Sequence, residues 1–215
     1  MTEDRSRLSG LYAITDQDLI PERLFAEYVS AALKGGAGII QYRDKSSDKE
    51  KRLQQASLCR QLCDQHDAVF IINDNIDLCR QVGADGVHLG KDDDAIDRAR
   101  ASLGNEAIIG ISCYDDMQRA IDAQQQGADY VAFGTMFSSP TKPHAPCAGP
   151  EMIGQAKNNN LHLPVCGIGG ITLDNATLAI EKGADMIAVI STLFASKDIE
   201  GTARKLSGLF TKPVN

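Results

Sequence analysis

Two aspartates, Asp74 and Asp93, each follow a short apolar run that ends in turn-forming residues. The runs cover residues 68–72 and 86–89, and such runs are typical of strands buried on both faces of a parallel sheet. Neighbouring parallel strands end side by side, so both carboxylates would reach the same rim. Two hard oxygen ligands there would suit Mg²⁺, with substrate phosphates and water completing its coordination. Alternatively, Asp74 serves only as the N-cap of the following helix.

Three cations, Arg43, Lys45 and Lys142, also follow predicted strands and would face the two aspartates. Cations and a divalent metal together can neutralise a diphosphate, which makes that group able to leave. The pattern therefore predicts a diphosphate site. The alternative for each residue taken singly is a surface cation in an ordinary salt bridge.

Two neutral amides, Gln41 and Asn73, lie at the ends of adjacent predicted strands. Amides can recognise the donor and acceptor edge of a heterocycle, although local backbone groups could equally satisfy them. His88 alternates with apolar residues, which favours a packed, hydrogen-bonded histidine inside the sheet. The other histidines are expected at the surface without a role: His66, His144 and His162.

A phosphate site is predicted from Gly169, Gly170, Ile190 and Ser191, where two further strands end. Glycines let backbone N–H groups approach an anion, and a helix N-terminus adds a favourable dipole. Gly-Ile-Gly-Gly is a weak motif alone, but it becomes stronger after the seventh strand of a barrel.

The elements that would position these residues alternate between strand and helix. Strands are predicted over residues 11–15, 38–42, 68–72, 86–89, 107–111, 130–133, 164–166 and 186–190. Helices are predicted over residues 21–34, 48–66, 95–103, 114–126, 150–157, 173–182 and 199–210, with a short helical piece ending at Cys79. A loop over residues 134–149 interrupts the alternation, and residues 1–10 would form a loose arm.

An internal repeat supports eight strand-then-helix units. Four related triplets each close a predicted helix and begin a strand, at residues 36–38, 83–85, 127–129 and 183–185. They recur about every two units, as expected for a closed (β/α)₈ TIM barrel, α/β in class and a single domain over residues 1–215. An open doubly wound sheet is the alternative. In the barrel, the polar residues above would ring the C-terminal mouth, where active sites lie.

Bulk properties exclude several classes of protein. The net charge of −7 argues against nucleic acid as a partner, and no apolar run is long enough to cross a membrane. Residues 1–10 are polar, so they do not form a secretory signal. The six cysteines are scattered, which favours reduced thiols in a cytoplasmic protein. A homo-oligomer is compatible with the sequence but not specified by it.

The chain resembles the thiamine-phosphate synthase family from about residue 8 to residue 209. Seven motifs in the family's order carry the resemblance: Gln41-Tyr-Arg43-Asp-Lys45, Ile72-Asn73-Asp74, Gly86-Val-His88-Leu-Gly-Lys-Asp-Asp93, Gly110-Ile-Ser112, Pro140-Thr141-Lys142, Gly167-Ile-Gly-Gly170-Ile-Thr172 and Val189-Ile190-Ser191.

The resemblance implies a transferase that joins 4-amino-2-methyl-5-hydroxymethylpyrimidine diphosphate to a thiazole (or carboxythiazole) phosphate, giving thiamine phosphate and diphosphate. In the family, Mg²⁺ assists ionisation of the C–O bond, and the thiazole nitrogen captures the resulting cation. Carried over by position, Asp74 and Asp93 would hold Mg²⁺. The pyrimidine diphosphate would bind Gln41, Arg43, Lys45, Asn73, Ser112 and Lys142, and Arg43, Lys45, Ser112 and Lys142 would act in catalysis. The thiazole phosphate would bind Ser139, Pro140, Thr141, Gly170, Ile190 and Ser191.

Two departures from the family pattern bear on the site. Lys91 replaces the usual Gln, which adds a cation near the proposed metal, and Ser139-Pro140-Thr141 replaces the commoner Thr-x-Thr while retaining the hydroxyls. Two other functions compete with the synthase: a thiazole tautomerase-like paralogue, which needs neither metal nor diphosphate, and a non-catalytic sensor of phosphate ligands. Retention of Asp74, Asp93, Lys45 and Lys142 argues against the tautomerase.

Overall fold

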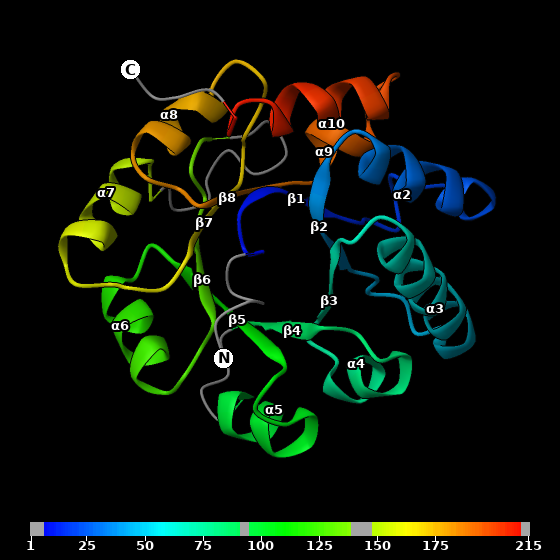
Figure 1. Cartoon of the computed structure of the whole chain (residues 1–215), viewed down its shortest axis with the longest axis horizontal. Coiled ribbons are helices and arrows are strands. Elements are labelled where there is room, and N and C mark those ends of the chain that lie inside the picture. Colours follow the sequence, from blue (N-terminus) through cyan, green and yellow to red (C-terminus); the bar gives the residue numbers. More distant parts are fainter. Residues whose placement is uncertain (1–6, 91–94, 139–147, 212–215) are drawn as a thin grey trace.

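Eight parallel strands form a closed barrel in chain order, in which β8 pairs back to β1 (Figure 1). The computed structural model describes residues 7–90, 95–138 and 148–211. The strands are β1 (Gly10–Ile14), β2 (Ala37–Tyr42), β3 (Val69–Asn73), β4 (Gly86–Leu89), β5 (Ile108–Tyr114), β6 (Tyr130–Phe133), β7 (Val165–Ile168) and β8 (Met186–Val189). The predicted (β/α)₈ barrel is confirmed, and the open sheet is wrong.

Helices surround the barrel between the strands (Figure 1). They are η1 (Glu22–Leu24), α2 (Phe25–Lys34), α3 (Lys49–Gln65), α4 (Ile76–Val82), α5 (Ala95–Leu103), α6 (Met117–Gln125), α7 (Glu151–Asn158), α8 (Ala176–Glu181), α9 (Ser191–Phe194) and α10 (Ile199–Ser207). Two helices differ from the prediction. The sequence does not predict α9, and it predicts a helix beginning at residue 114. In the structure, Tyr114 ends β5, and Asp116 caps α6 by accepting from Arg119 N–H. No helix within the described ranges is long and apolar enough to cross a membrane.

Alternation along each strand divides the core into two layers. On β1, Tyr12 and Ile14 belong to the cluster inside the barrel, whereas Leu11 and Ala13 belong to the cluster shared with the helices. Successive strand side chains point to opposite faces, so a barrel covered by helices requires apolar residues at nearly every strand position. Leu8 is buried within the inner cluster, and Gly10 begins β1, so the barrel begins earlier than the predicted arm allows.

The repeated triplets have a structural cause at the N-terminal end of the barrel. The first glycine of all four triplets has positive φ, at 94° for Gly36, 64° for Gly83, 86° for Gly127 and 96° for Gly183, which a residue with a side chain adopts only under strain. In the last three triplets, the aspartate two positions later accepts a hydrogen bond from the backbone N–H at or near the start of the preceding strand. These bonds are Phe70 to Asp85 (2.6 Å), Ile109 to Asp129 (2.8 Å) and Val165 to Asp185 (2.7 Å).

Each of these aspartates also pairs with a cation on the helix that leads into that preceding strand, namely α3, α5 or α7. The pairs are Arg60–Asp85 (3.0 Å), Arg100–Asp129 (2.5 Å) and Lys157–Asp185 (2.5 Å). The repeat therefore joins a helix to the starts of two adjacent strands, and it lies at the end of the barrel opposite the mouth. Its role is stability, which is the expected role of that end.

Candidate active site

The predicted site residues gather at the C-terminal ends of the strands, wherever the structure describes them. Gln41 lies in β2, Asn73 ends β3, and Ser112 lies in β5. Gly169 and Gly170 follow β7, Ile190 follows β8, and Ser191 begins α9. Six of the residues singled out from the sequence lie outside the described residues: Lys91, Asp93, Ser139, Pro140, Thr141 and Lys142.

Asp74 adopts an unusual backbone conformation at the mouth. Its φ is +58°, and its N–H donates to the carbonyl of His88 on the neighbouring strand at 2.8 Å. Asn75, not Asp74, caps α4, because its side chain accepts from Leu78 N–H at 2.9 Å. The alternative assignment of Asp74 as a helix cap is therefore wrong. A non-glycine residue held in the left-handed region is a recurrent feature of functional sites.

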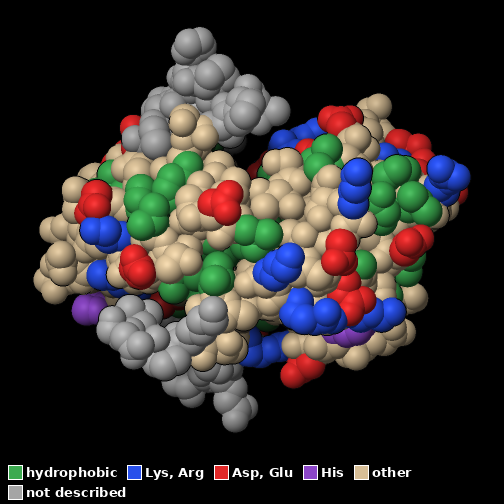
Figure 2. All heavy atoms as spheres, turned by 90° about the horizontal axis from the view of Figure 1, so that it is seen from above, with side chains coloured by type: hydrophobic (Ala, Val, Ile, Leu, Met, Phe, Trp, Pro, Cys, Tyr) green, Lys and Arg blue, Asp and Glu red, His purple; other side chains and the backbone are tan. Residues whose placement is uncertain are grey.

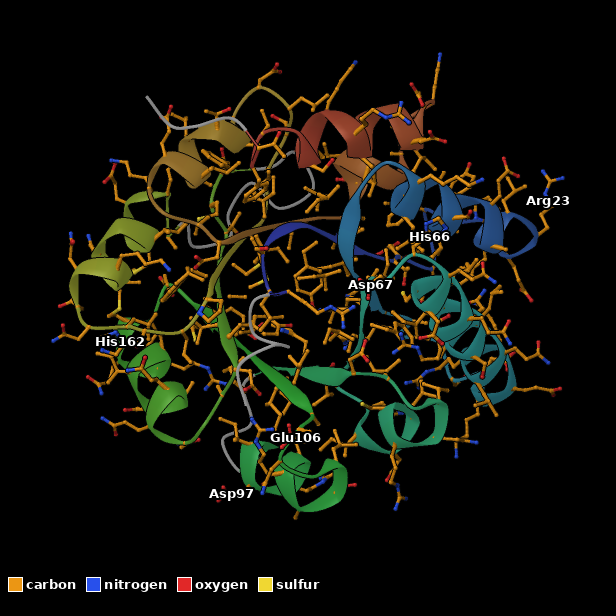
Figure 3. All side chains as sticks on the ribbon, in the orientation of Figure 1. Arg23, His66, Asp67, Asp97, Glu106 and His162 are labelled. Carbon is orange, nitrogen blue, oxygen red and sulfur yellow. The ribbon has the colours of Figure 1, made fainter. Side chains whose placement is uncertain are left out.

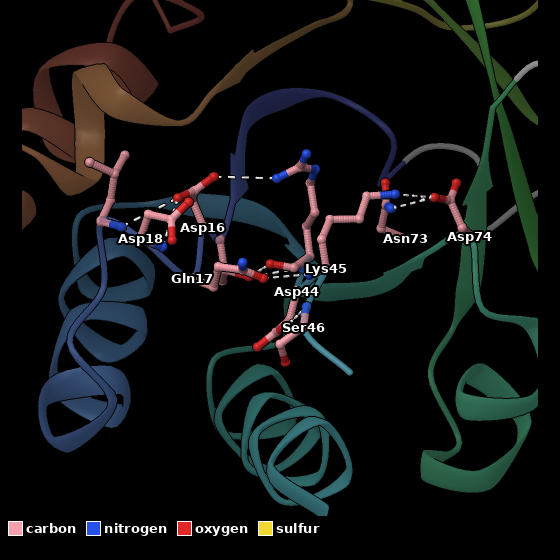
Figure 4. A network of polar contacts seen from close by, with 11 residues as sticks. Asp16, Gln17, Asp18, Asp44, Lys45, Ser46, Asn73 and Asp74 are labelled. Atoms are coloured by element: carbon pink, nitrogen blue, oxygen red, sulfur yellow. Dashed lines mark hydrogen bonds and ion pairs between the residues drawn. The ribbon is translucent and has the colours of Figure 1, made fainter. Parts of the chain in front are cut away.

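Lys45 and Asn73 both bind the Asp74 carboxylate. Lys45 Nζ lies 2.6 Å from Asp74 Oδ2, and Asn73 Nδ2 donates to the same oxygen at 2.9 Å (Figure 4). Asp74 Oδ1 lies 3.9 Å from the position that a Cβ on Gly90 would take. The lysine and aspartate side chains are 53% and 48% exposed, so the ion pair contributes little to stability.

The loop after β1 orients the cations that follow β2. Asp16 Oδ2 accepts from Arg43 at 3.3 Å, Thr15 Oγ1 accepts from the Arg43 backbone N–H at 2.9 Å, and Gln17 accepts from Lys45 N–H (Figure 4). Sequence reasoning missed Thr15, Asp16 and Gln17. Their position at the end of a predicted strand or directly after it, like that of the other site residues, is the signal that could have identified them.

Asp44 fixes the same loop from the helix side. Burial favours a raised pKa for its carboxyl, but hydrogen bonds from Ser46 and Lys51 outweigh burial and lower that pKa. Lys51 Nζ lies 2.9 Å from Asp44 Oδ2, and Ser46 N–H donates to Oδ1 at 2.7 Å. The charged Asp44 therefore holds the chain on which Arg43 and Lys45 are presented.

An open cavity of about 410 Å³ lies beside these residues. Its lining includes Lys45, Asn73 and Asp74 from the predicted site, together with two arginines, Arg52 of α3 and Arg98 of α5, that sequence reasoning did not select. Both arginines come from helices. The other site residues were identified because they follow predicted strands, and that criterion does not select residues within helices.

Tyr114 is a further mouth residue that the sequence does not indicate. It ends β5 with φ of +57° beside a register shift in the β5–β6 pairing, and it is 46% exposed. Its hydroxyl lies 4.0 Å from the position that a Cβ on Gly90 would take. Tyr114 and Asp74 thus flank the point where β4 leads into residues 91–94.

Gln41 and Ser112 face the inside of the barrel. Gln41 is buried and donates to the Tyr12 hydroxyl at 2.7 Å, and Ser112 Oγ lies 2.8 Å from His88 Nε2. His88 is buried, and its second ring nitrogen lies 2.9 Å from the Tyr130 hydroxyl, so the prediction of a packed, hydrogen-bonded histidine is confirmed. His66 and His162 lie at the surface as predicted (Figure 3), and His144 lies outside the described residues.

The glycine pair after β7 permits a close backbone approach. A Cβ on Gly170 would lie 2.2 Å from the Phe137 carbonyl oxygen, and φ there is +65°. Thr192 Oγ1 donates to the Ile171 carbonyl at 2.5 Å, which joins the loop after β7 to the start of α9. Gly170 and Ser191 are therefore presented by adjacent, mutually bonded segments.

The described cysteines do not supply a nucleophile. Cys59, Cys63, Cys79, Cys113 and Cys166 are free and buried. Burial raises the pKa of each thiol, to about 12 for Cys63, Cys79 and Cys113. These thiols are protonated at neutral pH, and the thiolate is the reactive form.

A family model described as thiamine monophosphate synthase matches residues 11–193. The chain belongs to the thiamine monophosphate synthase family. The thiamine-phosphate synthase of Thioalkalivibrio sulfidiphilus is 50% identical over 213 residues, which cover 98% of this chain and 99% of that protein. The thiamine-phosphate synthase of Nitrosococcus oceani is 50% identical over 92% of this chain and 91% of its own length.

The fold agrees with that of a solved thiamine phosphate pyrophosphorylase from Pyrococcus furiosus. The two superpose with a TM-score of 0.88 at 34% identity, covering 99% of this chain and 100% of the other. Membership in the thiamine monophosphate synthase family makes the chain a transferase of thiamine biosynthesis, and it excludes the non-catalytic sensor. The active site of such a barrel enzyme is expected at the C-terminal mouth.

Proposed function

We propose that the barrel mouth transfers the pyrimidine-methyl group of 4-amino-2-methyl-5-hydroxymethylpyrimidine diphosphate to the nitrogen of a thiazole (or carboxythiazole) phosphate. The C–O bond to the diphosphate breaks, the diphosphate keeps the electron pair, and a C–N bond to the thiazole forms. The observation that carries this proposal is the Lys45–Asp74–Asn73 cluster at the ends of β2 and β3. A carboxylate can bind Mg²⁺, and a cation beside it can bind a diphosphate oxygen, so the cluster suits a metal-bound diphosphate.

Magnesium fits the donors on this face. Lys45 and Asn73 both bind Asp74 Oδ2, and Asp74 Oδ1 is directed toward Gly90, where β4 leads into the segment that carries Asp93. Among residues 7–90, 95–138 and 148–211, no cluster of three His, Cys, Asp or Glu could hold a metal. As the family resemblance implies, Asp74 would share the ion with Asp93 and with substrate oxygens. When bound, Mg²⁺ would stabilise the charge that develops on the departing diphosphate.

The cations after β2 complete the diphosphate site in this proposal. Lys45 is half exposed, so its ammonium can move from Asp74 to a diphosphate oxygen without leaving a buried charge. Arg43 is held by Asp16 and Thr15, and a fixed guanidinium suits a bidentate contact with phosphate. Lys142 would add a third cation from the loop after β6.

Neutral and backbone groups would bind the other parts of the substrates. Gln41 and Asn73 would bind the pyrimidine ring, and Ser112 the pyrimidine diphosphate. Gly170, Ile190 and Ser191 would bind the thiazole phosphate with Ser139, Pro140 and Thr141. The joined loops after β7 and β8 support this assignment, because backbone N–H groups near glycines can approach an anion. We place the reaction in the cytoplasm, where the five free thiols among the described residues would stay reduced.

The test is diphosphate release from both substrates with Mg²⁺, comparing Asp74→Asn with the wild type. We expect kcat to fall at least about 100-fold, because the neutral amide is a poor Mg²⁺ ligand and transition-state charge loses its stabilisation. Glu106→Gln is the matched control, because Glu106 is exposed before β5 at the opposite end of the barrel (Figure 3). Wild-type turnover in Asp74→Asn, or an equal loss in Glu106→Gln, contradicts the proposal.

A further inference from the structure

A chain of hydrogen bonds crosses the inside of the barrel from Gln41 to Ser112. Gln41 Nε2 lies 2.7 Å from the Tyr12 hydroxyl, which lies 2.8 Å from the Tyr130 hydroxyl. Tyr130 Oη lies 2.9 Å from His88 Nδ1, and His88 Nε2 lies 2.8 Å from Ser112 Oγ. The five residues come from β2, β1, β6, β4 and β5, so this inner chain spans most of the barrel wall.

Gln41 as the first donor gives the inner chain one self-consistent direction. The Gln41 amide donates to Tyr12, which leaves the single hydroxyl proton of Tyr12 to be donated onward to Tyr130. The Tyr130 proton is then donated to His88 Nδ1, which must be the unprotonated ring nitrogen. The imidazole proton therefore sits on Nε2 and is donated to Ser112 Oγ. The hydroxyl proton of Ser112 remains for another acceptor.

Burial isolates the inner chain from solvent, since Tyr12, Tyr130 and His88 are all buried. Desolvation raises the pKa of Tyr12 and of Tyr130, so both keep their hydroxyl protons near neutral pH. The tyrosine rings pack at an edge-to-face angle of 64°, and the His88 ring stacks on Tyr130 with centroids 5.6 Å apart. Packing thus holds the donors and acceptors in line.

We propose that Tyr12, Tyr130 and His88 are positioning residues that set the hydrogen-bonding polarity of the two side chains at the ends of the inner chain. Gln41 is locked with its amide nitrogen toward Tyr12, which leaves its carbonyl oxygen to accept from an exocyclic amino group. Ser112 receives the His88 proton and is left to donate its own to a diphosphate oxygen. The inference rests on the proposed function, which puts the pyrimidine diphosphate against Gln41 and Ser112.

The tautomer of His88 reports this polarity directly. If the inner chain ran the other way, Ser112 would donate to Nε2 and His88 Nδ1 would carry the proton. ¹⁵N NMR of the full chain without substrate, with the His88 signal assigned by its loss in His88→Gln, is expected to show a protonated Nε2 and a bare Nδ1. A protonated Nδ1 overturns the proposal, and this readout holds whether or not the proposed reaction is correct.

Tyr130→Phe tests the consequence for substrate binding. The ring still packs, but both hydrogen bonds of the hydroxyl are lost. We expect KM for the pyrimidine diphosphate to rise about fivefold to tenfold, as for the loss of one or two neutral hydrogen bonds, with KM for the thiazole phosphate unchanged. We also expect the His88 tautomers to become mixed.

Controls separate positioning from a general loss of structure. Tyr28→Phe removes a phenol hydroxyl on α2, outside the barrel, and should leave both KM values unchanged. If Tyr130→Phe does not fold, Tyr12→Phe breaks the inner chain one bond earlier and carries the same expectation. Equal rises in both KM values, or no rise for the pyrimidine diphosphate in a folded variant, overturn the coupling. Failure of the wild type to release diphosphate would contradict the proposed function instead, while the tautomer remains measurable.

Discussion

At the scale of single residues, the mouth of the barrel contains residues held at positive φ, two of which are not glycine. Asp74 and Tyr114 have positive φ at the ends of β3 and β5, and Gly170 has positive φ after β7. Such conformations cost about 1–3 kcal/mol each for residues with a side chain and persist only where surrounding structure enforces them. Here the enforcement comes from strand ends, which place these residues at the mouth.

Gly170→Ala should weaken binding of the thiazole phosphate. Its new methyl group would collide with the Phe137 carbonyl, in addition to the strain of positive φ. We expect KM for the thiazole phosphate to rise at least about tenfold and stability to fall by about 1–3 kcal/mol. Gly104→Ala is the matched control, since φ is +87° there but no atom lies within 4 Å of the added Cβ. Similar losses in the two variants would show that crowding at Gly170 is unimportant.

His88 should make stability depend on pH. Its folded pKa of about 4 lies below the ordinary 6.5, so the unfolded chain binds the proton more tightly. The contribution of neutral His88 to the free energy of unfolding is complete above pH 6.5. It is lost as pH falls toward 4, by at most about 1.4 kcal/mol per pH unit. Urea unfolding of wild type and His88→Gln between pH 7 and 4.5 should give a stability difference that shrinks with acidity. A constant difference would contradict the depressed pKa.

At the scale of elements, the aspartates of three repeated triplets join α3, α5 and α7 to two strands each. Asp129 is the most buried of them in its ion pair, with side-chain exposures of 20% for Arg100 and 10% for Asp129, against 34% and 37% for Lys157 and Asp185. Removing one charge from a buried pair leaves the other uncompensated, whereas exposed pairs contribute little. Asp129, in the more buried ion pair, should therefore contribute more to the free energy of unfolding than Asp185.

Asp129→Asn is expected to lower the free energy of unfolding by about 2–4 kcal/mol, and Asp185→Asn by about 1 kcal/mol or less. Denaturant unfolding measures both. Turnover per folded molecule should stay at the wild-type value in each, because these residues lie at the end of the barrel opposite the mouth. Equal destabilisation would show that the backbone hydrogen bonds, not burial of the ion pair, decide the effect.

At the scale of the whole molecule, stability and chemistry occupy opposite ends of one barrel. The inner and outer apolar clusters run through the structure between them. On the face seen in Figure 2, acidic and basic side chains are interspersed rather than gathered by sign. Apolar contacts and strand pairing account for the closure of the barrel.

Removal of Mg²⁺ should therefore abolish turnover without unfolding the protein. With a chelator present, we expect diphosphate release to stop while the far-ultraviolet circular dichroism spectrum and the thermal midpoint, measured without substrates, stay unchanged. Restoring Mg²⁺ should restore turnover. Turnover that continues under chelation would contradict the metal-assisted step, and a lowered midpoint would contradict the separation of stability from chemistry.

The sequence by itself determined the barrel and the identity of most mouth residues. Strand ends are readable because each apolar run stops at a polar residue, and parallel strands must bring those ends together. Tertiary structure alone decided that Asp74 is not a helix cap, that Asp16 holds Arg43, and that Gln41 and Ser112 join through Tyr12, Tyr130 and His88. Those contacts join residues from different strands across a closed cylinder, and no spacing along the chain encodes which inward-facing side chains meet there.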